Sequence, residues 1–246
     1  MMADLKRISV RVPRIIALLI LFAVEVLFTI IITKTSSQAI TAVGFMSYFG
    51  QFTQTVIPVA LGLIELHAIY ADDFKAKTMQ IAIGIGVKRR HIVLSKFFEM
   101  LILVVVDLIL YGLIIVAAAT CAGLQIESPH LVMLVSYLIS NGISIMVYTA
   151  LTMILIFYMQ STGISVLLYV LFSLTIVNKI VGLIISIGFL ESLSLGRFLA
   201  TSLITKFYTS LMLGTFHVKS FIGIMIYIVM AYIVTTILFK KRELEF

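Results

Sequence analysis

Long apolar runs separated by short polar breaks dominate this chain. Most runs reach the length of about 20 residues that an α-helix needs to cross about 30 Å of hydrocarbon. The runs are continuous and lack the alternation of apolar and polar residues seen in membrane β-barrel strands. The pattern therefore predicts an all-α integral membrane protein with one transmembrane domain over residues 1–246. The six predicted spans are residues 15–33, 44–70, 97–120, 131–158, 163 to about 177, and 221–239.

The composition supports this interpretation and narrows the chemistry. Hydrophobic residues make up 62% of the chain and charged residues 12%, whereas globular domains are about half apolar and about a quarter charged. Cys121 is the only cysteine, which excludes an intrachain disulfide and a cysteine-based metal cluster. The four histidines show no metal-ligand spacing. Residues 15–33 follow a basic segment but are too long for a signal peptide, so we expect a retained span.

Basic residues gather on one side of the predicted topology. Six spans bring both ends of the chain to one side, where thirteen Lys and Arg residues fall, against four on the other side and Lys179 near a span end. The positive-inside rule then predicts cytoplasmic termini. It also accounts for the net charge of +7 without nucleic-acid binding. The thirteen are Lys6, Arg7, Arg11, Arg14, Lys75, Lys77, Lys88, Arg89, Arg90, Lys96, Lys240, Lys241 and Arg242, and the four are Lys34, Arg197, Lys206 and Lys219.

The segment before the first span has two interpretations. Leu5, Ile8 and Val12 share one helical face, while Arg7, Arg11 and Arg14 repeat the same spacing on the opposite face. This spacing is typical of an amphipathic helix on the inner membrane surface, with its arginines directed toward headgroups or a partner. The alternative is a basic tail that serves only topology.

The last third of the chain contains a tight turn and a broken apolar segment. Residues 159–162 are uncharged and predict a short cytoplasmic hairpin between the fourth and fifth spans. Residues 180–220 are interrupted by glycines and by Glu191, and the next span must start outside. We expect either an external segment whose apolar part dips back into the outer leaflet or a fifth helix that continues to about Leu190.

A polar loop, residues 71–96, lies between the second and third spans. Its pattern predicts a short helix over about 73–83, with acidic residues at the N-terminus, where the helix dipole favours them. Gly84 and Gly86 then interrupt the helix, and a basic step at residues 88–90 leads back to the membrane at Lys96. A loop that serves only topology needs the charges but not this ordered arrangement.

The order of these features resembles that of the ABC-2 type permeases, the membrane subunits of ATP-binding cassette exporters. In that family, the loop between spans two and three runs from acidic residues through a short coupling helix and a glycine to a basic step. Here Asp72 and Asp73, residues 78–83, Gly86, residues 88–90 and Lys96 follow the same order. The surface helix, the six spans, the uncharged turn, the broken external segment and the basic tail extend the resemblance over the whole chain.

The resemblance implies that this polar loop carries a coupling helix that binds a separate ATPase subunit. The chain has no G-x-x-x-x-G-K-[ST] phosphate loop, so we expect no enzyme here, and ATP and Mg²⁺ in the partner subunit. The resemblance also implies two ATPase subunits, a second identical or homologous permease chain, a bacterial cell membrane, and an amphipathic peptide cargo such as a bacteriocin, lantibiotic or toxin peptide. The implied partner-binding residues are Asp72, Asp73, Phe74, Lys75, Lys77, Thr78, Met79, Gln80, Ile83, Arg89 and Arg90.

Ionisable residues inside the spans suggest a translocation path or, alternatively, an ion-coupled secondary carrier. Glu25 and Asp107 each lie about ten residues into a span, near the midplane, without an obvious basic partner. Each is expected either to be neutral and hydrogen-bonded or to contact cargo or relay protons. Pro58 is expected to kink the second span, and Glu65 and His67 to lie at the interface. Ser165 and His217 fall at opposite membrane surfaces, which excludes a nucleophile and base pair.

Overall fold

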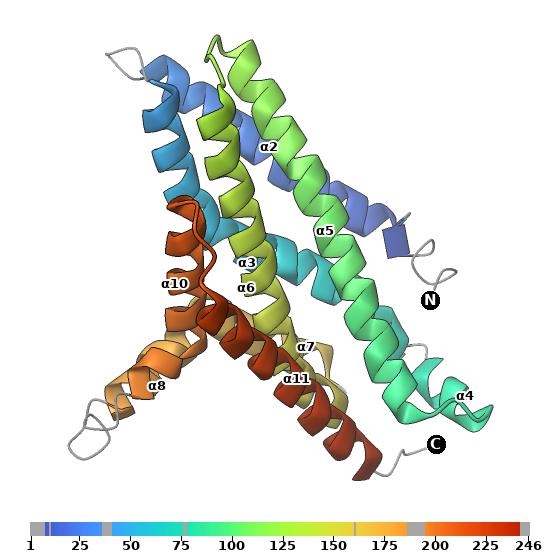
Figure 1. Cartoon of the computed structure of the whole chain (residues 1–246). Helices are drawn as coiled ribbons and strands as arrows, with labels where there is room; N and C mark the ends of the chain where they lie inside the picture. The colour runs from blue at the N-terminus through green and yellow to red at the C-terminus, as the bar shows by residue number, and fades with distance from the viewer. Residues whose placement is uncertain are drawn as a thin grey trace.

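Every element of regular secondary structure in the described part of the chain is a helix. The computed structural model describes residues 8–9, 11–35, 41–75, 78–159, 161–185 and 195–241. Figure 1 shows the arrangement of the elements. In chain order they are α2 (Val12–Thr35), α3 (Ala42–Lys75), α4 (Thr78–Gly84), α5 (Arg89–Cys121), α6 (Ser128–Met159), α7 (Thr162–Ser173), α8 (Ile176–Ile185), the 3₁₀ helix η1 (Leu195–Phe198), α10 (Ala200–Met212) and α11 (Val218–Lys241).

Five of these helices are long and apolar enough to cross a membrane, and there are six if the bent pair α7 and α8 forms one span. The predicted all-α membrane architecture is confirmed at this level. The observed helices extend beyond the predicted spans, most clearly α5, which begins at Arg89 and not at residue 97. Polar residues continue the hydrogen-bonded backbone past the apolar stretch, because helix formation does not require every side chain to be apolar.

The fifth span is broken. Helix α7 ends at Ser173, and the following helix α8 leaves at an angle of 59°. Between them Thr175 has a φ of 59°, in the left-handed region that β-branched residues rarely adopt. A fifth helix that continues to about Leu190 is thus interrupted at Thr175, and the bent pair is compatible with one broken span or with a re-entrant segment. Residues 186–190 lie outside the described part of the chain.

Helix α10 returns the chain along the bundle before the last span. It packs against both α6 and α11. The Tyr227 hydroxyl of α11 donates to the Phe198 carbonyl at 2.8 Å, and Phe207 makes ring contacts with Phe216 and Phe221. Part of the predicted external segment is thus a helix held against two spans, while residues 186–194 of that prediction lie outside the described residues.

Helix α6 lies at the centre of the bundle, where it packs against α3, α5, α7, α10 and α11. Its buried face includes many small polar residues, among them Ser140, Asn141, Ser144, Thr149 and Thr152. Small side chains let membrane helices approach closely, since lipid provides no hydrophobic force between them. The Ser144 and Thr152 hydroxyls donate to carbonyls one turn earlier in α6, which satisfies these groups inside the helix.

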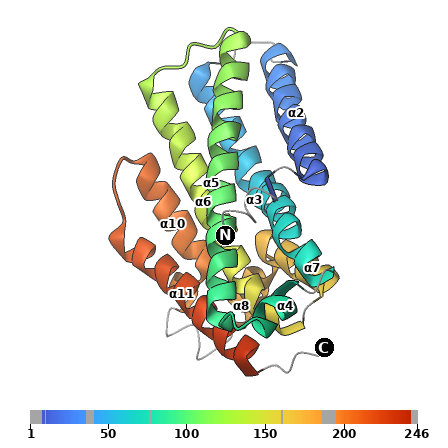
Figure 2. The ribbon, with the colours of Figure 1, turned by 90° about the vertical axis from the view of Figure 1, so that its right-hand side faces the viewer.

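The two outermost spans, α2 and α11, are only 22% and 17% buried over their most apolar windows. Figure 2 shows them on opposite sides of α5 and α6. Their large exposed apolar side chains form faces suited to lipid contact. The start of α2, the short α4 and the end of α11 lie on the right-hand side of the bundle in Figure 1.

Candidate functional site

One face of α2 carries charged side chains into the bundle. Arg14, Leu18, Leu21, Glu25 and Thr29 are buried and recur at intervals of three or four residues, which places them on one face of the helix. This face packs against α3 and α5. A guanidinium and a carboxyl group therefore lie in the interface between three helices.

Arg14 pairs with two carboxylates from two different helices. Its Nε atom donates to both oxygens of Glu65 in α3, at 2.8 and 3.1 Å, and its Nη2 atom donates to Oδ2 of Asp107 in α5, at 2.6 Å. The side chains of Arg14, Glu65 and Asp107 are 7%, 0% and 2% exposed. We refer to these three residues as the ion triad. Because water is excluded, removing the cation would leave the acids uncompensated.

The ion triad overturns one expectation, because Asp107 does have a basic partner. Glu65, expected near the membrane interface, is fully buried between the packed helices. The physical reason lies in α2, which begins at Val12 with Pro13 in its first turn, where proline is well tolerated. Arg14 is thus part of the span and points inward. Arg14 and Glu25 are spaced so that they lie on one face of the helix, and this spacing could have revealed from the sequence that Arg14 points inward.

The predicted surface helix before the first span is also contradicted where it is described. Ile8 is fully buried and Val12 is 65% exposed, so these two residues do not share an apolar face. Arg11 donates from Nη1 to the Ala68 carbonyl at 2.8 Å and so ties the chain to α3. Residues 1–7 and 10 of this prediction lie outside the described part.

Glu25 lies deeper on the same face of α2. Its carboxyl is fully buried, and the Tyr111 hydroxyl of α5 lies beside it. Within the described residues, neither the two carboxyl oxygens nor this hydroxyl completes a hydrogen bond. No ion pair found among the described residues includes Glu25.

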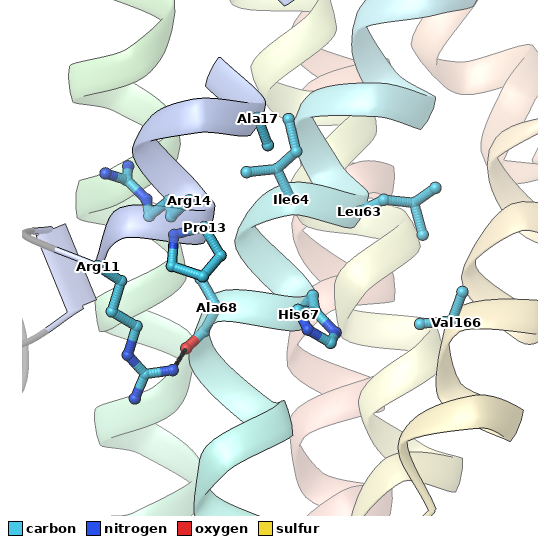
Figure 3. A pocket seen from close by; sticks show the side chains of 9 residues that line it. All are labelled: Arg11, Pro13, Arg14, Ala17, Leu63, Ile64, His67, Ala68 and Val166. Carbon is cyan, nitrogen blue, oxygen red and sulfur yellow. Dashed lines mark hydrogen bonds between the residues drawn. The ribbon is translucent and has the colours of Figure 1, made fainter. Parts of the chain in front are cut away.

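A pocket of about 460 Å³ opens beside the ion triad, between α2, α3 and α7. Figure 3 shows Arg14 directed away from it while Arg11 reaches the Ala68 carbonyl. The pocket is largely apolar, with His67 among its polar groups. It brings an open space up to the side chain that holds both acids. The full lining is Arg11, Pro13, Arg14, Ala17, Leu63, Ile64, His67, Ala68 and Val166.

Pro58 lies midway along α3. Figure 1 shows that α3 changes direction along its length. Proline removes one backbone hydrogen bond and bends a helix. The Tyr169 hydroxyl of α7 donates to the Pro58 carbonyl at 2.6 Å. Gly62, one turn further along α3, makes room for the Tyr169 ring, since a Cβ at this glycine would overlap the ring and its hydroxyl. The bent part of α3 is therefore fitted closely to α7.

The polar loop differs from the predicted single helix over 73–83. The span α3 continues to Lys75, so Asp72, Asp73 and Phe74 belong to its last turn. A separate helix, α4, runs from Thr78 to Gly84, and Lys77 lies outside the described residues. The acids thus end the span and do not begin the short helix.

Helix α4 is anchored on one side and open on another. Met79 is 7% exposed and Ile83 is partly buried, whereas Ile81 and Ile85 are 61% and 78% exposed. Gly86 follows with a φ of 93°, a conformation that favours glycine. Thr78 and Gln80 are placed in α4 by their backbone.

The two arginines of the basic step after α4 have different surroundings, since Arg89 is packed against α11 and Arg90 is exposed. Arg89 donates to the Phe239 and Lys240 carbonyls at the end of α11, and its guanidinium lies 5.4 Å from the Phe239 ring centroid. Positive side chains at a helix C-terminus also complement its dipole. Arg90 is exposed. Arg89 therefore joins the start of α5 to the end of α11, beside the exposed face of α4.

Comparisons with known proteins found no match among family models, curated proteins or solved structures. Over the described ranges, no three His, Cys, Asp or Glu side chains lie close enough together to hold a metal ion.

Proposed function

We propose that this chain is the permease subunit of an ATP-driven exporter of the ABC-2 type. The observation that carries the proposal is a short helix, α4, between two spanning helices, with an exposed apolar face next to a basic step. Ile85 lies in the turn just after α4, and its N–H donates to the Ile81 carbonyl, so the two exposed side chains lie one helical turn apart and form a short apolar ridge. A ridge of this kind in water is typical of a surface that a partner covers.

The partner that fits this proposal is a separate ATPase. The sequence has no phosphate loop of its own, so ATP and Mg²⁺ bind the partner subunit. Docking of Ile81 and Ile85 transmits closure of the ATPase to α3 and α5, which flank α4. The exporter consists of two permease chains and two ATPase subunits in a bacterial cell membrane, with both termini in the cytoplasm.

The proposed cargo is an amphipathic peptide. Support comes from the family resemblance and from the apolar character of the chain, which contains 12 Met and 17 Phe residues and no Trp. Unbranched Met side chains adapt to irregular apolar surfaces. A labelled cationic amphipathic peptide tests this function in inside-out membrane vesicles. We expect ATP-dependent uptake when the chain and its ATPase are both present, and uptake without the chain would contradict the proposal.

The double substitution Ile81→Asp and Ile85→Asp tests the docking ridge. Two carboxylates at the centre of an apolar interface lose their hydration, and we expect peptide uptake to fall at least about tenfold, which corresponds to about 1.4 kcal/mol. Folding is expected to be preserved because both side chains are exposed. Uptake in vesicles and elution volume on gel filtration measure the two effects.

The matched control is Leu213→Asp, which changes another exposed apolar residue, in the turn between α10 and α11. Figure 1 shows this turn away from α4. Uptake should stay close to that of the unchanged chain. Equal losses in the control and in the double variant would contradict a specific docking role for α4.

An ion-coupled secondary carrier is the second candidate function. The buried Glu25 favours it, because a carboxyl at this depth with no cation partner in the described structure is suited to binding an ion. The same vesicles distinguish the two functions. Uptake that persists without ATP and collapses with an ionophore supports the carrier, whereas uptake that requires ATP and survives the ionophore supports the exporter.

A further inference from the structure

The interface between α2, α3 and α5 contains more carboxyl groups than cations. In the ion triad, Glu65 and Asp107 share the single guanidinium of Arg14. Two ionised carboxylates beside one cation would leave one negative charge in a region that excludes water. Like charges held this close favour protonation of one of the two groups. The charges of the ion triad therefore balance when one of its two carboxyls is neutral.

Glu25 adds a third carboxyl without a cation. It lies about 16 Å from Arg14 along α2, which follows from 11 residues at 1.5 Å each. Its polar neighbour, Tyr111, lies one turn beyond Asp107 on α5. Tyr111 brings a hydroxyl but no positive charge. A buried carboxyl in such surroundings is least costly in its neutral form.

Among the described residues, the other charged and titratable groups near these helices do not supply the missing cations. Arg11 has partners of its own, including the Ala68 carbonyl. Lys96 pairs with Glu99 at 2.8 Å, so these two α5 residues balance each other. His67 lines the neighbouring pocket and forms no hydrogen bond or ion pair with either acid in the described structure. The buried titratable groups brought by the packed helices α6 and α7 include the tyrosines Tyr148 and Tyr169.

The pocket beside Arg14 brings open space close to the ion triad. It holds about 460 Å³ between α2, α3 and α7 and is large enough for several water molecules. Arg14, which lines this pocket, binds Glu65 and Asp107, and Tyr111 lies one turn beyond Asp107 on α5, beside Glu25.

We propose that Glu25, Glu65, Asp107 and Arg14 form a proton-binding site that holds two protons at neutral pH. One proton is on Glu65, which binds the same guanidinium of Arg14 as the Asp107 carboxylate, and the other is on Glu25. The ligand is the proton itself, which exchanges with water through the pocket. This site is independent of α4 and adds a proton-binding step to the proposed exporter.

The site links proton binding to the packing of α2. The packed state binds protons that fully hydrated carboxyls would release at neutral pH. Separation of α2 from α3 and α5 would therefore release protons, and raising the pH would favour that separation. Any transport movement that separates α2 from α3 and α5 would thus be accompanied by the release of a defined number of protons.

Infrared spectroscopy of the full chain in lipid vesicles tests the proposal directly. Neutral carboxyls have a carbonyl stretch separate from that of carboxylates, and it shifts in deuterated water. At neutral pH we expect this band in the unchanged chain. Glu25→Gln should remove about half of it, and so should Asp107→Asn, because Glu65 then has Arg14 to itself; the double variant should remove all of it.

The matched control is Glu99→Gln. Glu99 is as buried as the other acids but has Lys96 as its own cation, so this variant should leave the band unchanged. Absence of the band from the unchanged chain at neutral pH would overturn the proposal, as would a band that survives undiminished in the double variant. If that variant does not fold, the unchanged chain and Glu25→Gln still decide the outcome. The measurement needs no ATPase, so its failure is distinct from failure of the exporter function.

Discussion

Replacing Arg14 with Met is expected to destabilise the protein by about 3–5 kcal/mol, the usual cost of breaking a buried ion pair from one side. Met keeps much of the apolar stem but leaves Glu65 and Asp107 without their cation. The contact between the start of α2 and the helices α3 and α5 should be lost first. Denaturant unfolding in detergent micelles measures the free energy of unfolding.

A rescue experiment separates lost charge pairing from lost packing. Adding Glu65→Gln and Asp107→Asn to Arg14→Met should recover most of the lost stability, because no buried charge then remains unpaired. Arg90→Met is the control, since Arg90 is exposed and should change stability by less than about 0.5 kcal/mol. If the triple variant were as unstable as Arg14→Met alone, the unpaired charges of the ion triad would not be the cause of the lost stability.

Gly62→Ala is expected to cost about 1–3 kcal/mol through overpacking. The new Cβ would overlap the ring of Tyr169, which is fully buried and cannot swing into solvent. Moving the ring also breaks the hydrogen bond from Tyr169 to the Pro58 carbonyl, so α7 should loosen from the bend of α3. The same unfolding measurement in micelles records the loss.

Two further variants show whether the loss in Gly62→Ala arises at Tyr169. Gly163→Ala, at the start of α7, adds a methyl group in open space and should have little effect. Combining Gly62→Ala with Tyr169→Leu should cost less than the two single changes added together, because they share one contact. Strict additivity would contradict the proposed close fit.

The sequence was sufficient for the membrane class and the approximate spans because continuous apolar runs leave no other stable fold. It was not sufficient for the break after Ser173. That break occurs at Thr175, and neither glycine nor proline marks it. Helix α7 packs there against α6 and against α3, and α3 is far from α7 in the sequence.

The ion triad shows a second limit of sequence reasoning. The positive-inside rule counts Arg14 with the residues outside the membrane, whereas the structure turns it into the bundle. Glu65 and Asp107 lie 51 and 93 residues away in the sequence, so their pairing with Arg14 depends on how three helices rotate against one another. The periodicity of α2 indicates a buried face but does not name its partners.

The sequence predicted that the polar loop contains a short helix but did not predict where that helix begins. Glycines and charges correctly indicated a short helical segment, while the boundary near residues 75–78 was missed because the span extends through Asp72 and Asp73. Element ends are set by a few weak hydrogen bonds and capping contacts. The exposure of Ile81 and Ile85 also required the structure, since apolar residues in a loop are as readily buried as presented.

Copurification tests the central claim of the proposed exporter most directly. An affinity-tagged chain is expressed together with a candidate phosphate-loop ATPase from the same genome, and the complex is isolated in a mild detergent. We expect the ATPase to elute with the unchanged chain and with Leu213→Asp, and to be lost with the Ile81→Asp and Ile85→Asp double variant. A folded, unchanged chain that elutes without any ATPase would contradict the claim.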